Sequence, residues 1–123
     1  MKQIEIGILK NRTAFEPGSE LAGAVSWNLD TSPEAVEVRL FWFTSGKGTR
    51  DAEGIETVRF DQPPSEDIKL FRFRLPPEPY SFSGKLITLT WAVEIVVKPS
   101  EDSAIAEFTM APGGREVALN PGE

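Results

Sequence analysis

The feature that most constrains this chain is the segment of residues 85–97, in which large apolar side chains occupy every second position almost without interruption. Successive side chains of a β-strand point to opposite faces of a sheet, whereas a helix repeats every 3.6 residues. The segment therefore predicts one long strand with one buried face. That face would consist of Ile87, Leu89, Trp91, Val93, Ile95 and Val97.

Shorter segments with the same alternation surround this strand, and prolines and glycines separate them at strand-length intervals. No stretch has a sustained helical period. The spacing predicts an all-β fold, an immunoglobulin-like antiparallel β-sandwich of about seven or eight strands. It forms one domain, residues 1–112, followed by a flexible C-terminal tail, residues 113–123, that has little to bury. The expected strands are residues 3–9, 21–28, 35–43, 55–61, 67–75, 85–97 and 103–110.

Two interruptions of the pattern carry information. Residues 44–54 are polar and contain three glycines, which predicts a mobile hairpin loop. In the strand that follows, Ile55 is out of phase with Val58 and Phe60, which predicts a β-bulge or a register slip. Within the strand at residues 21–28, Gly23 is expected where another part of the backbone approaches closely. The three tryptophans, Trp27, Trp42 and Trp91, share the parity of core residues and are predicted in the core.

Composition excludes several kinds of chemistry. The 123 residues carry a formal net charge of −6 and include no cysteine and no histidine. The chain therefore lacks thiol nucleophiles, disulfides, the usual zinc ligands and imidazole as a general base. The acidic balance disfavours nucleic acid and anionic lipid, which both attract basic surfaces. Because no segment has the length of a membrane span and the start lacks a leader pattern, we expect a cytoplasmic protein without membrane insertion.

Patterns associated with catalysis or ligand binding are incomplete. Residues 45–49 lack the adjacent Lys-Ser/Thr pair and the following helix of a phosphate-binding loop, which favours a hairpin loop. Glu101 and Asp102 supply few of the six or more oxygens that Ca²⁺ needs, which favours a solvated turn. No two carboxylates have the apolar neighbours that would separate their pKa values for acid–base catalysis. We therefore expect no enzymatic activity, no catalytic residue, no metal site and no cofactor.

Several short motifs follow one another in an informative order: residues 15–25 (FEPGSELAGAV), 36–43, 71–76 (FRFRLP), 79–81 (PYS), Gly84, the long strand from Leu86, and 107–112 (EFTMAP). In this order, over roughly residues 3–112, the chain resembles the arrestin-type sandwich in the form of its N-terminal domain. Arrestins and retromer-associated trafficking proteins pair two such sandwiches. This sequence shows one, so small bacterial proteins with a single arrestin-like domain are the closer comparison. The buried charged cluster and regulatory tail of receptor-binding arrestins have no match, so receptor recognition does not carry over.

Two groups of side chains are candidates for a surface role. Phe41 and Phe43 have the outward parity of their strand. Either neighbouring loops cover them, or they form an exposed apolar patch that binds a protein. Lys69, Arg72 and Arg74 form a local basic group, for which a solvated sheet face with acidic neighbours is favoured over an anion site. Phe41 and Phe43 are therefore the candidate protein-binding patch.

The expected function is a non-enzymatic protein–protein interaction or scaffold module with an unknown protein partner, since function depends on sites rather than folds. Open sheet edges also predict a homodimer through edge strands. Two alternatives remain. One is a sandwich that binds, and in one version hydrolyses, a small molecule or glycan; the other is an accessory subunit of a larger complex. Trp42 or Trp91 exposed in a groove beside carboxylates would favour the first alternative.

Overall fold

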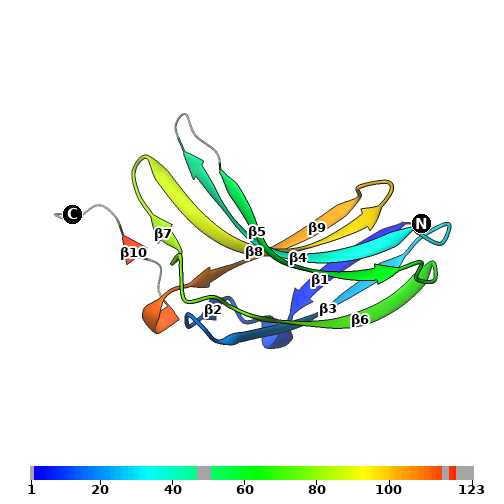
Figure 1. Ribbon diagram of the computed structural model, residues 1–123, viewed down its shortest axis with the longest axis horizontal. Coiled ribbons are helices and arrows are strands. Elements are labelled where there is room, and N and C mark those ends of the chain that lie inside the picture. The colour runs from blue at the N-terminus through cyan, green and yellow to red at the C-terminus, as the bar shows by residue number, and fades with distance from the viewer. Residues whose placement is uncertain (1, 47–50, 115–116, 119–123) are drawn as a thin grey trace.

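The computed structural model describes residues 2–46, 51–114 and 117–118, which form two β-sheets packed face to face (Figure 1). The seven strands of six or more residues in this part of the chain confirm the predicted all-β sandwich. No helix among these residues is long and apolar enough to cross a membrane. The elements are β1 (Gln3–Ile8), η1 (Leu9–Asn11), β2 (Ala14–Phe15), β3 (Glu20–Asn28), β4 (Ala35–Gly46), β5 (Ala52–Asp61), β6 (Glu66–Arg74), β7 (Phe82–Ser83), β8 (Ile87–Lys98), β9 (Ser103–Met110), η2 (Pro112–Gly114) and β10 (Val117–Ala118).

The two sheets differ in size. The smaller sheet has the order β1-β3-β6, and both of its strand pairs are antiparallel. The larger sheet has the order β10-β7-β8-β4-β5, and β9 pairs with β8 on one side and with β2 on the other. Strand β8 pairs with β4 along its whole length and is the strand predicted at residues 85–97. Its predicted inward side chains from Leu89 to Val97 are all buried, and Ile87 is partly exposed.

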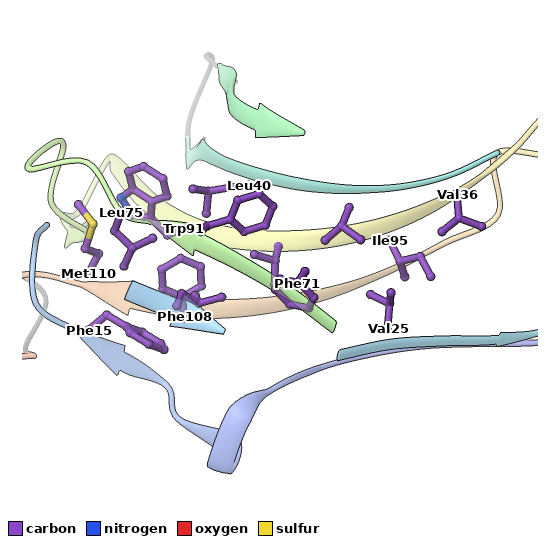
Figure 2. Packing of buried hydrophobic residues seen from close by; sticks show 14 of the residues in the cluster. Phe15, Val25, Val36, Leu40, Phe71, Leu75, Trp91, Ile95, Phe108 and Met110 are labelled. Carbon is purple, nitrogen blue, oxygen red and sulfur yellow. The ribbon is translucent and has the colours of Figure 1, made fainter. Parts of the chain in front are cut away.

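The hydrophobic core lies between the sheets and contains large aromatic side chains (Figure 2). Trp91 is fully buried, and its indole N–H donates a 2.8 Å hydrogen bond to the carbonyl oxygen of Pro79. The centroid of the Phe108 ring lies 6.2 Å from that of Trp91 and 5.4 Å from that of Phe15. Trp27 is buried in the same way, with its indole N–H bonded to a main-chain carbonyl. These two tryptophans bury their rings without leaving a polar group unsatisfied.

Trp42 departs from the prediction that all three tryptophans are core residues. It packs against the core but is only partly buried. Its backbone pairs with Glu53 of β5, in a stretch of that strand where every residue from Ala52 to Thr57 is exposed. The ring therefore has little cover on the β5 side. Its indole nitrogen is buried, and it finds no hydrogen-bond partner among the described residues.

The predicted bulge is confirmed. Leu40 pairs with Glu56 and Phe41 pairs with Gly54, so Ile55 lies opposite no residue of β4. The extra residue explains why Ile55 is out of phase with the strand that follows it.

The predicted loop at residues 44–54 is wrong in its extent. Strand β4 continues to Gly46 because its polar end pairs with β8, and β5 begins at Ala52. The Thr44 amide also donates a 2.7 Å hydrogen bond to the carbonyl of Asp51. The hairpin predicted at residues 45–49 falls in part on residues 47–50, which lie outside the described residues.

The predicted tail begins inside η2. Beyond it, β10 pairs in parallel with β7, at Val117–Phe82 and Ala118–Ser83. Residues 115–116 and 119–123, the rest of the predicted flexible tail, lie outside the described residues.

Candidate binding surface on the smaller sheet

The structure places Phe41 and Phe43 together on the outer face of the larger sheet. Their ring centroids lie 5.9 Å apart, and both side chains are partly buried. In the sheet they lie beside Ala92 and Thr90 of β8. Each ring thus has neighbours on its own face, and the greater apolar exposure lies on the other sheet.

Two aliphatic side chains on the outward side of β6 are the most exposed large apolar groups among the described residues. Leu70 is 80% exposed and Ile68 is 68% exposed. We call the outward side of β1, β3 and β6 the small-sheet face. The sequence contains the signal for this face, because side chains alternate along a strand. If Phe71 and Phe73 point inward, Ile68 and Leu70 of the same strand must point outward. The apolar centre of this face consists of Gly7, Leu9, Ala22, Ala24, Ile68 and Leu70.

The strand register shows which of these groups are neighbours. Gly7, Ala24 and Leu70 lie opposite one another across the three strands, and Ala22 lies opposite Arg72. A groove of about 470 Å³ lies over these residues. Its floor is low because glycine and alanine have little or no side chain, and Leu70 and Arg72 form one wall.

Gly23 allows the floor of the groove to lie close to the core. A Cβ atom on Gly23 would meet the carbonyl of Gly7 and would lie 2.6 Å from the Phe71 ring. By contrast, a Cβ atom on Gly7 would meet nothing within 4 Å. The predicted close backbone approach at Gly23 is therefore confirmed.

Opposite charges lie at the two ends of the small-sheet face. Glu5 lies in the same row as Ile68, and Glu66 lies one row further from the centre, so this end is acidic. Arg72 and Arg74 lie at the other end, where Glu20 is the acidic neighbour. The apolar groove thus lies between an acidic end and an end with two arginines.

The predicted basic group is divided between two faces. Lys69 has the inward parity of β6, and its Nζ lies 3.6 Å from a carboxylate oxygen of Asp67. Arg72 points outward, with its Nε 3.6 Å from a carboxylate oxygen of Glu20. Arg74 is exposed and donates a 3.0 Å hydrogen bond to a main-chain carbonyl. Arg72 and Arg74 therefore match the predicted solvated sheet face, whereas Lys69 lies on the inward side of β6.

Several carboxylates elsewhere are paired with cations. Arg39 donates hydrogen bonds of 2.7 and 3.1 Å to Glu37, and Arg59 donates one of 2.8 Å to the same carboxylate. The bonds from Arg39, followed by that from Arg59, lower the pKa of Glu37 against the opposing effect of desolvation. Arg59 also donates a 2.7 Å hydrogen bond to Asp61. A carboxyl group with a lowered pKa is ionised at neutral pH and is a poor general acid.

The acidic turn at Glu101 and Asp102 binds two different lysines. Lys98 donates hydrogen bonds of 2.7 and 2.8 Å to Glu101. Lys2 donates one of 2.7 Å to Asp102, and this bond is the main cause of the lowered pKa of Asp102. Within the described ranges, no group of three or more Asp, Glu, His or Cys residues could hold a metal ion.

Comparison with known proteins rests on structure, since no family model matches and no curated protein matches the sequence. Among solved structures, the chain is similar to Spo0M, a sporulation control protein from Bacillus subtilis, with a TM-score of 0.66 and 18% identity. The match covers 89% of this chain and 49% of that one, so the chain spans about half the length of Spo0M. This likeness supports an arrestin-like fold. At this identity it shows the fold alone.

Two other solved structures match less well. One is an alkylpurine DNA glycosylase from Pseudomonas fluorescens, with a TM-score of 0.46 and 9% identity over 89% of this chain and 30% of that one. The other is a β-glucosidase from Listeria innocua, with a TM-score of 0.49 and 13% identity over 95% of this chain and 16% of that one. Likeness at this level carries no argument about function.

Proposed function

We propose that this protein is a non-enzymatic, arrestin-like interaction module that binds a protein partner through the small-sheet face. The observation that supports this proposal is the exposure of Leu70 and Ile68, 80% and 68%, on a sheet whose other side is packed into the core. A contiguous apolar surface with a charged rim is typical of interaction sites. The fold-level likeness to a sporulation control protein is consistent with a regulatory role, and we place that role in the cytoplasm.

A glycan-binding or hydrolytic role has less support. It requires a cleft in which aromatic rings and polar groups converge. Trp91 is fully buried and its N–H is bonded to the carbonyl of Pro79, so its ring cannot line such a cleft. Trp42 packs on the core, and its buried N–H faces no polar partner among the described residues.

We place the contact on the small-sheet face rather than on the open edge of β5. Ile55 forms a bulge there, and the charged side chains of Glu53, Glu56 and Arg59 are exposed on this strand. Bulges and charges on an edge oppose the addition of another strand. A homodimer through this edge is therefore a weaker proposal than a partner on the face.

The test compares three immobilised proteins: the wild type, an Ile68→Ser/Leu70→Asp variant, and Leu86→Asp as a matched control. Leu86 is 67% exposed, close to the 68% of Ile68, and directly precedes β8 of the larger sheet. Each protein is incubated with extract of the organism that supplies the gene, and retained proteins are quantified by mass spectrometry. We expect at least one protein that the wild type and the control retain and the face variant loses by about tenfold or more. Identical retained sets for all three proteins would contradict the proposal.

A further inference from the structure

The small-sheet face is uneven, and its high and low side chains limit the shape of the partner surface that fits on it. Leu70 stands above the face along β6, whereas Gly7 has no side chain and Ala22 and Ala24 offer only methyl groups. On the opposite side of this floor, Leu9 is 59% exposed and borders the same groove. The occupant must therefore present a narrow apolar stripe that fits between Leu70 and Leu9.

The dimensions of the face suit one helix. Neighbouring strands lie about 4.8 Å apart, so the axes of three strands span roughly 10 Å, which is close to the diameter of an α-helix. From Glu66 to Arg74, β6 extends over eight steps of about 3.3 Å, or roughly 26 Å. A helix that rises 1.5 Å per residue covers this length with about 18 residues.

The charges at the two ends give the helix a direction. Acidic residues stabilise the first turn of a helix and basic residues stabilise the last turn, because of the helix dipole. Acidic side chains in the first turn would meet Arg72 and Arg74, and basic side chains in the last turn would meet Glu5 and Glu66. Strand β3 begins beside Arg74 and ends beside Glu66, so the helix would run parallel to β3.

A second copy of this chain fits the face less well. If a two-fold axis reverses the strand direction, Leu70 meets Leu70 of the other copy and the low floors at Gly7 and Ala24 stay empty. If the axis keeps the strand direction, Leu70 of each copy enters the groove of the other copy, but Glu66 of one copy approaches Glu5 of the other. A symmetric contact between two copies of this face, with their strands aligned, has only these two arrangements. Neither of them matches both the shape and the charges of the face.

We infer that the partner presents an amphipathic α-helix of about 18 residues, which lies in the groove of the small-sheet face and parallel to β3. This inference rests on the proposed function, because it names the chemistry of the partner at the same surface. The helix packs the apolar side chains of one stripe, at positions i, i+3, i+4 and i+7, between Leu70 and Leu9. Its acidic first turn contacts Arg72 and Arg74, and its basic last turn contacts Glu5 and Glu66.

The test uses two fluorescein-labelled peptides of about 18 residues. Both have the same leucine stripe and the same composition. The forward peptide has glutamates in the first turn and lysines in the last, and the reversed peptide has the opposite arrangement. Fluorescence anisotropy with the wild-type protein should show that the forward peptide binds about tenfold more tightly at low salt. High salt should reduce this preference, since it screens exposed charges.

Protein variants separate binding at the groove from the intrinsic helicity of the peptides. Leu70→Asp should weaken both peptides by about tenfold or more, whereas Leu86→Asp should weaken neither. Exchanging the charges at both ends, with Glu5→Lys, Glu66→Lys, Arg72→Glu and Arg74→Glu together, should reverse the preference between the peptides. Thermal unfolding of each variant checks that these outward substitutions leave the fold intact.

Three results would overturn the helix inference: equal affinity of the wild type for both peptides, unchanged affinity in Leu70→Asp, or a wild-type dimer in analytical ultracentrifugation that Leu70→Asp dissociates. The last result would assign the face to a second copy. If the face variant loses retained proteins in extract while neither peptide binds, the proposed function stands and the helix inference fails. If the face variant loses none, the proposed function itself fails.

Discussion

Replacing Trp91 with alanine should lower the free energy of unfolding by about 3–5 kcal/mol. Trp91 is 0% exposed and packs against Phe108, so the substitution removes buried apolar surface and leaves a cavity. It also leaves the carbonyl of Pro79 without the indole N–H that donates to it at 2.8 Å. Losing one partner of a buried hydrogen bond accounts for about 1–3 kcal/mol, which forms part of the total.

Trp42 provides a matched control, because it pairs with Trp91 across β4 and β8. The same substitution there removes a ring that is only partly buried and an N–H that has no partner among the described residues. We therefore expect Trp42→Ala to lower the free energy of unfolding by roughly 2 kcal/mol, clearly less than Trp91→Ala. Trp91→Phe, which keeps an aromatic ring but removes the hydrogen bond, should fall between the two.

The measurement is urea unfolding followed by far-UV circular dichroism, since these substitutions change the intrinsic fluorescence. A domain of this size has a total stability of about 5–15 kcal/mol, so Trp91→Ala removes a large share of it. The same loss of free energy should lower the thermal midpoint by roughly 12–20 °C. Unchanged m-values would show that the unfolded states are comparable. The reasoning is refuted if Trp91→Ala is no more destabilising than Trp42→Ala.

Three further predictions concern the glycine, the acidic network and the bulge. Gly23→Ala should lower the free energy of unfolding by about 1–3 kcal/mol, because the new methyl group meets the Phe71 ring and a carbonyl, whereas Gly7→Ala should be nearly neutral in the same urea titration. The pKa of Glu37 is lowered from its usual 4.5 in the folded state. Its contribution to stability should therefore be complete above about pH 4.5 and decrease as the pH falls further, and Glu37→Gln should reduce this acid dependence of the urea midpoint. Deleting Ile55 should preserve the fold but regularise the open edge of β5, so light scattering should show more self-association than the wild type; equal scattering would contradict a protective bulge.

Much of the fold could be predicted from local patterns. Period-two alternation identified the long strand β8 and its buried face, because one sheet face contacts the core and the other does not. The phase change at Ile55 identified the bulge for the same reason. The end of the β4–β5 hairpin could not be predicted, since the polar residues near Thr44 form strand only because β5 and β8 pair with them.

Only part of the candidate site could be predicted from the sequence. Alternation with Phe71 places Leu70 outward, and that inference requires no tertiary information. Whether an outward side chain is covered depends on the side chains that surround it on its face. Phe41 lies with its ring centroid 5.9 Å from that of Phe43 and is partly buried, whereas Leu70 lies beside Ala24 and stays exposed.

By itself, the sequence determined where the seven longer strands lie, apart from the end of the β4–β5 hairpin, and which face of each is apolar, because side-chain direction in a strand follows from backbone geometry alone. Only the tertiary structure decided the register, which places Gly7, Ala24 and Leu70 in one row and sets Glu66 and Arg74 at opposite ends of one face. Register arises from pairing between segments that are distant in the chain, so no local pattern contains it. The groove, its depth and its charge direction are therefore properties of the assembled sheet.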